Sequence, residues 1–556
     1  MRFARYRLAL AMFACAPAWA AVADHREFSA ELNAPWQGDA VAARAFTLAF
    51  DFPLAPAPQR IDWQLVLRDQ AGKVVRQWDG SAALFHEPLQ VVVRWDGRLA
   101  GVAPRPGVYH VTLRASARED GAAGRPLDDA GDADVVEQRW DIAVGQRAMP
   151  TMAPFAPLPM PRGPLSAAPA PAALPYTVWL GNLHSQTGHS DGGGALENCH
   201  GAQEPQSSPL GPAEAFAYAR GRGLDILVAS EHNHMYDGSD GTNPDADTLA
   251  ARALYQSGLA AAAAFNALHP DFIAVYGLEW GVINHGGHMN IFNSSELLGW
   301  ERNREGELVA DRYTAKGDYA GLYSLMRAQG WIGQFNHPAA KGQFMLGGVA
   351  LGYSADGDEA MALCEVVNST AFSVNTTETE TRRSTFEGAC NKALEAGYHV
   401  AFSSNQDNHC ANWGVSAANR TGVLIPNGAQ PGRAALIDAL RARRVFATMD
   451  KTSQLVLSAN SHLMGERFVN RGRLTLAAHF ASSAGKQVAA VAMMEGVPGR
   501  NGQVSVLSEM ATVTIEPIPG PHFYYARLTQ TDGNILWSAP VWVDQQVASQ
   551  LPHQAH

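Results

Sequence analysis

The pattern of apolar and polar residues divides the chain into regions with different predicted structure. In residues 25–145, short runs alternate apolar with polar positions and are separated by turn sequences such as Asp96-Gly97. Several short strands of this kind, each burying one face, predict a β-sandwich. The runs lie at residues 46–50, 63–67, 91–93, 107–113 and 140–144.

A Pro/Ala-rich segment at residues 146–175 separates this region from the next. Because such composition supports neither a helix nor a β-ladder, we expect a semi-extended spacer. In residues 176–450, strand-like runs then alternate with segments of helical periodicity. This alternation predicts an α/β domain with a mainly parallel sheet, either closed or doubly wound. We expect strands at 176–183, 224–229, 272–276, 331–335, 362–367 and 399–403, and helices at 213–222, 246–268, 319–329, 381–396 and 434–442.

Alternating runs return in residues 451–548, which predicts a second β-sandwich at the C-terminal end. The clearest of these runs lie at residues 473–478, 488–494, 511–515, 523–528 and 539–543.

The first twenty residues have the pattern of a cleavable signal peptide. They begin with three arginines, continue with an apolar run and end with the small-x-small sequence Ala18-Trp19-Ala20. We therefore expect a periplasmic or secreted protein. Four cysteines remain in the mature chain, and an oxidising compartment permits two disulfides among them in any of three pairings. They are Cys199, Cys364, Cys390 and Cys410.

The charge balance and the lack of long apolar stretches exclude two kinds of partner. The formal net charge is −11, and the chain has no basic run, which argues against nucleic acid as the main partner. Beyond the signal peptide, no apolar stretch is long enough to cross a bilayer. A small-molecule substrate is the remaining expectation.

His, Asp and Glu residues follow five of the six strands expected in residues 176–450. The exception is the run at 362–367, which is followed by Asn368-Ser369-Thr370. Sites in α/β domains form at the carboxyl ends of strands, so these side chains should converge. Imidazole and carboxylate are the ligands of zinc, manganese or iron. The candidate ligands are His184, Asp191, His232, Glu279, His288, His337, Asp407 and His409.

Four short motifs in this region also carry a resemblance to a known family. They are His184-Ser185-Gln186 with Ser190-Asp191-Gly192, Ser230-Glu231-His232-Asn233, Asn336-His337-Pro338 and Asp407-Asn408-His409. With Glu279, they resemble the PHP superfamily of polymerase-associated and histidinol-phosphatase domains, over about half of the chain. The segments at 277–281 and 288–292 are most similar to its branch of carbaryl-type carbamate hydrolases. The resemblance implies a distorted (β/α)7 barrel, here flanked by N-terminal and C-terminal β-sandwiches.

The resemblance also implies how the ligands are shared among metal ions. Relatives hold two or three ions, but Gln186 replaces a second histidine and is a weaker ligand, so we expect two. Glu231 replaces an aspartate, and we expect it to support the neighbouring ligand His232 without binding a metal ion itself. The implied sets are His184, Glu279 and Asp407 with Gln186 as a doubtful fourth ligand, then the bridging Glu279 with His288 and His337, and then His232, His409 and Asp191.

Such a centre predicts hydrolysis by a metal-activated water. His409 or His288 could protonate the leaving group, and Arg420 could stabilise an anionic oxygen, although a structural salt bridge is the alternative for Arg420. Three hypotheses about the function remain open at this point. They are phosphoester hydrolysis, as in the superfamily at large; carbamate, ester or amide hydrolysis, as in the nearer branch; and metal or ligand binding without catalysis.

Overall fold

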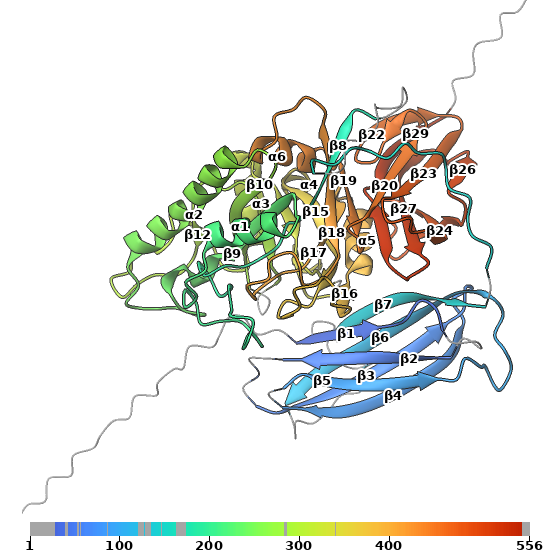
Figure 1. The fold of residues 1–556 in the computed structure, drawn as a ribbon, viewed down its shortest axis with the longest axis horizontal. Coiled ribbons are helices and arrows are strands. Elements are labelled where there is room, and N and C mark those ends of the chain that lie inside the picture. The colour runs from blue at the N-terminus through green and yellow to red at the C-terminus, as the bar shows by residue number, and fades with distance from the viewer. Residues whose placement is uncertain are drawn as a thin grey trace, which may run out of the picture.

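The structure is a computed structural model. It describes residues 28–547, apart from 39–42, 53–54, 56, 86, 120–126, 128–134, 146, 163–173, 283–285 and 340. The predicted signal peptide therefore lies outside the described residues. The N-terminal strands form one body beside a central α/β region, and the C-terminal strands adjoin that region on another side (Figure 1).

The N-terminal strands form two antiparallel sheets around an apolar core. Side chains alternate between the buried core and the surface, as Phe46, Leu48 and Phe50 show on β2, where all three are buried. This is the alternation that one-sided burial produces. One sheet is β1 (Ser29–Asn33), β2 (Arg44–Asp51) and β5 (Leu89–Trp95), and the other is β4 (Val74–Leu84), β3 (Gln59–Arg68), β6 (Gly107–Glu119) and β7 (Val135–Val144).

The central region begins with three parallel strands, β8 (Tyr176–Asn182), β9 (Ile226–His232) and β10 (Ile273–Trp280). Every residue of β9 and β10 is buried, as expected for strands covered on both faces. Two helices connect them, α1 (Pro212–Gly221) and α2 (Thr248–Leu268), the second capped by the Asp247 side chain. A short 3₁₀ helix, η2 (Asn233–Asp237), follows β9.

A second parallel set follows later in the chain. It comprises β14 (Gly333–Phe335), β15 (Met361–Ser369) and β17 (Ala401–Asn405). The remaining elements of this part are β12 (Leu298–Gly299), β13 (Arg312–Tyr313), α3 (Tyr319–Gln329), α4 (Ala355–Ala360), β16 (Arg383–Thr385) and α5 (Glu387–Ala396).

The predicted (β/α)7 barrel is wrong. β11 (Met289–Ile291) lies antiparallel between β10 and β14, while β18 (Arg420–Pro426) and β19 (Val445–Thr448) continue the sheet antiparallel from β8, with α6 (Arg433–Arg441) between them. Among the described residues, no β-ladder joins β17 to β8 or β18. The reason is that β10–β11 and β18–β19 are antiparallel pairs, so the region does not repeat one strand and one helix around a closed ring.

The C-terminal strands are continuous with the central sheet, because β19 pairs with β28 (Ile535–Ser538). The strands of the expected C-terminal sandwich therefore pair with the central sheet. Its strands extend the sheet through β27 (Gly520–Gln530), β24 (Val488–Gly496) and β25 (Ser505–Ser508), with β29 (Val541–Gln546) and β22 (Arg467–Arg471) beside them. A further sheet contains β21 (His462–Leu463), β20 (Ser453–Ala459), β23 (Leu474–Ser482) and β26 (Thr512–Ile515).

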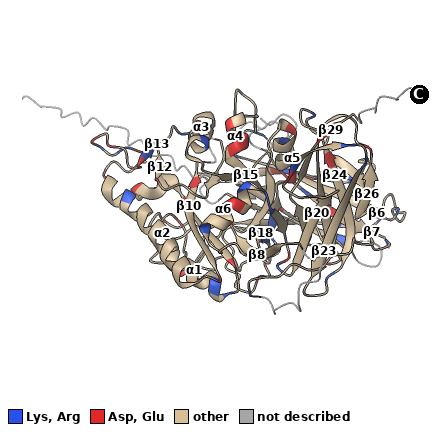
Figure 2. Ribbon diagram, turned by 90° about the horizontal axis from the view of Figure 1, so that it is seen from above, with Lys and Arg blue, Asp and Glu red and all other residues tan. Residues whose placement is uncertain are grey.

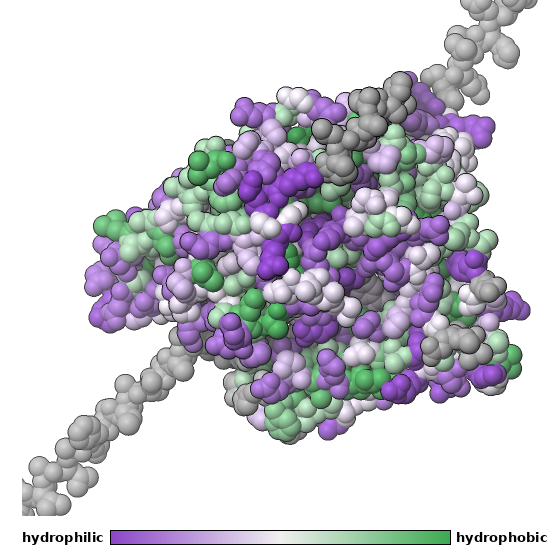
Figure 3. All heavy atoms as spheres, in the orientation of Figure 1, coloured by the Kyte–Doolittle hydropathy of each residue, from purple (hydrophilic) through white to green (hydrophobic). Residues whose placement is uncertain are grey.

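The surface is mixed in both charge and hydropathy. Acidic and basic residues are interspersed over the elements seen in Figure 2. Polar and apolar side chains likewise alternate over the face shown in Figure 3. Over the described part of the chain, no helix combines the length and apolar character that crossing a membrane requires.

Candidate metal centre

Five strands of the central sheet, β8, β9, β10, β14 and β17, place their carboxyl ends, or the loops after them, around one buried cluster. Glu279 on β10 is the register partner of His232 on the neighbouring parallel strand β9, so these two side chains start next to each other. Isolated bridges pair Ser185 with Asn408 and Gly194 with Cys410, which hold the loops after β8 and β17 together. The predicted convergence of strand ends is therefore what the structure has, although the sheet that produces it is not the expected barrel.

Glu279 lies at the middle of the cluster. Its Oε2 is 2.9 Å from Nε2 of His184 and 3.6 Å from Nδ1 of His232. Its Oε1 is 3.1 Å from Nδ1 of His288 and 3.4 Å from Nε2 of His337. One carboxylate therefore faces four imidazoles with both oxygens, which is the position of a bridging ligand.

Two aspartates complete the cluster, and each lies close to two of its histidines. Oδ1 of Asp407 lies 3.0 Å from Nε2 of His184, and its Oδ2 lies 4.0 Å from Nε2 of His337. Asp191 places Oδ1 3.7 Å from Nε2 of His232 and Oδ2 3.5 Å from Nε2 of His409. All eight candidate ligands predicted from the sequence thus share one site.

The spacing of these atoms fits shared metal ions. Two ligand atoms that each lie about 2.1 Å from one ion are about 3.0 to 3.5 Å apart at angles from 90° to tetrahedral. Several of the contacts above have this separation, and those near 3.5 Å are longer than a hydrogen bond. Three groups keep their ligand atoms within 4.8 Å of one another. They are His184, Glu279 and His337; His232, Glu279 and His288; and Asp191, His232 and His409.

One group, Asp191 with His232 and His409, is a set that the resemblance implied, and the other two differ from the implied sets. His337 is grouped with His184, and Asp407 lies near both, whereas His288 is grouped with His232. His232 belongs to two groups, with Nδ1 toward Glu279 and Nε2 toward Asp191. A neutral imidazole has a single acceptor nitrogen, so His232 can serve only one of its two groups at a time. With a neutral His232, the three groups therefore cannot all bind an ion at the same time.

Opposite charges offset the burial of this cluster. Burial lowers the pKa of His184, but the neighbouring carboxylates, first Asp407 and then Glu279, outweigh burial and raise it well above its usual value. Burial raises the pKa of Glu279, but the imidazoles, His184 first, hold it well below its usual value. Burial also lowers the pKa of His409, and the Asp191 carboxylate outweighs it and raises that pKa to about 9. The carboxylates are thus held in the ionised form that binds cations.

The cluster is most open at Asp407. Its side chain is 14% exposed and that of His337 is 7%, whereas the side chains of the other candidate ligands are at most 2% exposed. Both residues also have left-handed backbone, with φ of 49° and 28°. Non-glycine residues in this conformation are strained by about 1–3 kcal/mol and concentrate at functional sites. Solvent therefore reaches the cluster mainly from the side of Asp407 and His337.

One residue of the site was missed by the sequence analysis. Glu365 lies within β15, fully buried, with Oε1 3.2 Å from Nδ1 of His184 and Oε2 accepting a hydrogen bond of 2.7 Å from the backbone N–H of His337. It therefore fixes the ring of one ligand and the backbone of another. The available signal was an acid inside the apolar run at 361–367, which the search of strand ends passed over.

Replacing Glu365 by Gln is expected to weaken metal binding by about 10- to 100-fold, because carboxylates behind a ligating histidine contribute that much to affinity. Competition with a chromogenic chelator would measure the change. The matched control is Glu395→Gln, a buried acid on α5 that accepts backbone hydrogen bonds from Gly502 and Gln503. This control should lower stability and leave metal affinity unchanged, and equal metal affinity in both variants would remove Glu365 from the site.

Gln186 and Glu231 are the two departures from the family motifs. In this structure, both make hydrogen bonds that support the loop after β8 or a candidate ligand. The Gln186 side-chain nitrogen donates to Oε2 of Glu279 at 2.6 Å, and its oxygen accepts from Ser190. Glu231 accepts from Thr187 and Ser190, and burial raises its pKa to about 7. Gln186 can therefore bind a metal only if its amide turns over, and Glu231 supports the loop that carries Gln186.

Arg420 is engaged in a structural ion pair. Its guanidinium binds the Glu378 carboxylate and donates to the carbonyls of Ala417 and Asn419 at 2.9 and 2.8 Å. It is buried, and burial lowers its pKa. The salt-bridge alternative from the sequence analysis is therefore the arrangement observed, and the structure gives no support to a role on an anionic oxygen.

Comparisons with known proteins found no family. No protein-family model matches the chain, and no curated protein is similar to it. Among solved structures, β-glucuronidase 2 of Bacteroides uniformis matches at 10% identity and a TM-score of 0.15, over 94% of this chain and 61% of its own. A putative β-galactosidase of Bacteroides fragilis matches at 10% identity and 0.14, over 95% and 74%. The chain thus spans less than two thirds of the first of these proteins, and superpositions with such scores do not define a shared fold.

These comparisons correct the family expected from the sequence. No PHP family model matches the chain, and the central sheet is not the barrel that the PHP resemblance implied. Membership of that superfamily, and the phosphoesterase and carbamate-hydrolase functions inferred from it, were therefore wrong predictions. The cluster of His, Asp and Glu side chains does not depend on the family resemblance, because the structure itself brings these side chains together.

Proposed function

We propose that this protein is a hydrolase of a small-molecule substrate that uses two divalent metal ions held by the buried cluster. The single observation that carries the proposal is Glu279, whose carboxylate faces four imidazoles in a fully buried site. Four buried imidazoles around one carboxylate are far more than a hydrogen-bond network needs, and they are the ligand types that divalent transition metals select.

The ligands would be held before any ion binds, because the residues behind them are themselves fixed. Glu365 positions His184, and Asn336 donates from Nδ2 to Oε1 of Glu279 at 2.8 Å and to Asn290 at 2.8 Å. When bound, divalent ions at such a site polarise a substrate oxygen and lower the pKa of water. Low exposure around Glu279 keeps other water from the reacting groups.

Substrate would enter beside Asp407 and His337, the most exposed ligands. His409 lies on this side, with Nδ1 3.8 Å from Oδ1 of Asp407 and its ring packed on Phe372. His288 lies deeper, against Glu279. Of the two histidines proposed as proton donors, His409 is therefore better placed to serve a leaving group.

Metal content and hydrolysis can be tested together. Purified protein would be stripped with a chelator, loaded separately with Zn²⁺, Mn²⁺ or Fe²⁺, and assayed on p-nitrophenyl glycosides, esters and phosphates. We expect about two equivalents of bound ion and a hydrolytic rate that disappears on chelation and returns on reloading. If the protein bound metal but hydrolysed none of these compounds, it would be a metal-binding protein without this activity. If it bound no metal, the proposal would be refuted.

Restoring a histidine at position 186 tests the metal stoichiometry. Gln186→His should raise metal affinity or add bound metal, because an imidazole would replace an amide that now donates to Glu279. Isothermal titration calorimetry with Mn²⁺ would show the difference against the unmodified protein. No change in affinity or stoichiometry would place residue 186 outside the ligand sphere.

We also propose that the protein acts in the periplasm or outside the cell. The structure pairs Cys199 with Cys410 and Cys364 with Cys390, both buried. Disulfides persist in oxidising compartments and are rare in the cytosol. Amino-terminal sequencing of protein from the periplasmic or culture fraction should find a mature end near Ala21, and an intact Met1 in the cytosolic fraction alone would contradict export.

A further inference from the structure

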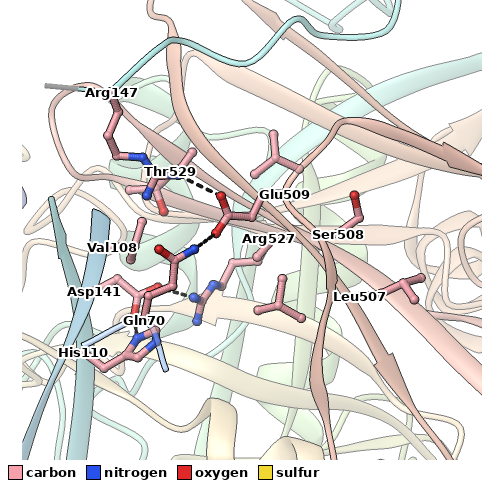
Figure 4. Close-up of a pocket in the computed structure, with 14 residues that line it drawn as sticks. Gln70, Val108, His110, Asp141, Arg147, Leu507, Ser508, Glu509, Arg527 and Thr529 are labelled. Carbon is pink, nitrogen blue, oxygen red and sulfur yellow. Dashed lines mark hydrogen bonds and ion pairs between the residues drawn. The ribbon is translucent and has the colours of Figure 1, made fainter. Parts of the chain in front are cut away.

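A cavity of about 420 Å³ lies between the N-terminal strands and the C-terminal strands, on elements other than those of the metal cluster. Figure 4 shows the side chains that point into it from both bodies. β6 and β7 supply one wall and β24, β25 and β27 the other. This volume is in the range of small-molecule sites, about 300–1,000 Å³.

The charges that line the cavity balance and are already paired. Arg527 forms an ion pair with Asp141, whose other oxygen lies 2.6 Å from Nδ1 of His110. Arg147 binds Glu509 at 3.1 Å. Two cations therefore face two anions. An ionic ligand of either sign would bring an uncompensated charge into the cavity.

One polar bridge closes the cavity on one side. Gln70 on the N-terminal body donates from Nε2 to Oε1 of Glu509 on the C-terminal body, and Arg147 of the spacer binds the other oxygen. Figure 4 shows these contacts at the edge of the cavity. Three segments far apart in the sequence thus meet at Glu509.

The cavity also contains a donor that the described residues do not satisfy. Nη1 of Arg147 is buried and has no hydrogen-bond acceptor among the described residues. A buried guanidinium N–H without an acceptor is unfavourable, and the other N–H groups of Arg147 hold Glu509 at the edge of the cavity. Around it, the walls are partly apolar, with Val108, Leu507 and the small residues Ala490 and Ala492.

We propose that this cavity binds an uncharged, polyhydroxylated small molecule of the size of a mono- or disaccharide. Hydroxyl groups accept from the arginines and donate to Asp141 and Glu509 without altering the charge balance. The C–H faces of such a molecule pack against the apolar wall. The paired charges disfavour acidic and amino sugars.

Calorimetric titration of the full-length protein tests the proposal with defined probes. The neutral probes are glucose, galactose, maltose and myo-inositol, and the charged counterparts are glucuronate and glucosamine. We expect saturable binding of at least one neutral probe and at least tenfold weaker binding of both charged counterparts. No heat from any neutral probe, or equal binding of a charged counterpart, would overturn the proposal.

A pair of variants locates the binding. Ala492→Leu fills the cavity from β24 and should reduce affinity at least tenfold, whereas Ala484→Leu, on an exposed turn, should leave it unchanged. Thermal unfolding of both variants checks that the fold is kept. Because Ala492→Leu could perturb its strand, Arg147→Gln provides a second variant that removes one of the two arginines lining the cavity. Undiminished binding in both cavity variants would place the ligand elsewhere.

Discussion

Replacing Glu279 by Gln is expected to remove at least one equivalent of bound metal and to abolish hydrolysis. The Glu279 carboxylate lies 2.9 to 3.6 Å from imidazole nitrogens of His184, His288, His337 and His232, so it is shared by two of the three ligand groups. An amide keeps the shape, but it loses the charge and turns a donor toward a cation. We expect the loss of rate to exceed 1,000-fold, roughly the effect of removing 4 kcal/mol of transition-state stabilisation.

Metal analysis by mass spectrometry and steady-state rates would measure this result. The matched control is Glu301→Gln, a buried acid of the same region outside the cluster. It should keep full metal content and rate. If Glu279→Gln retained both, the central role of this carboxylate would be refuted.

Removal of the Cys199–Cys410 disulfide is expected to be the most destabilising change outside the cluster. The bond joins residues 211 positions apart, and the chain-entropy model assigns a loop of this length about 5 kcal/mol of stabilisation. Cys410 directly follows His409, so the same bond also tethers the loop that carries Asp407. The double variant Cys199→Ser, Cys410→Ser should therefore unfold at lower denaturant and bind metal more weakly.

The second disulfide provides the comparison for this prediction. Cys364 and Cys390 are 26 positions apart, and the same model assigns about 3 to 4 kcal/mol to that bond. Urea titrations of the two double variants should place the first at the lower midpoint. An equal or reversed order would mean that strain or residual structure in the unfolded chain, and not loop length, governs their contributions.

The composition of the site was predictable because its residues stand next to strand ends. His232 ends the apolar strand β9, and Asp407 and His409 follow β17 within four residues, so strand ends alone located them. Glu365 could not be found in this way, because it lies inside β15 and reaches the site from beneath His184. The grouping of the ligands around Glu279 was also missed, although the group of Asp191, His232 and His409 was expected. It depends on which side of Glu279 each ring takes, and chain order does not encode that side.

Many of the individual helices and strands could be predicted, but the order and direction of the strands in the central sheet could not. The helix expected at 246–268 exists as α2, and the five runs expected in the N-terminal region lie within β2, β3, β5, β6 and β7, whereas β1 and β4 were not expected. The order of strands in the sheet instead depends on non-local pairs. β11 is three residues long and lies in a stretch without clear periodicity, and β18 and β19 were not expected at all. Short antiparallel partners of this kind leave little signal in the pattern of residues.

The pairing of β19 with β28 links the order of synthesis to folding. β19 ends at Thr448, and the strand that covers its edge begins at Ile535, almost ninety residues later. A chain emerging from the ribosome or the translocation channel would therefore expose that edge until its final segment arrives. Exposed edges recruit other strands, so fragments ending between these positions should aggregate while the full chain does not.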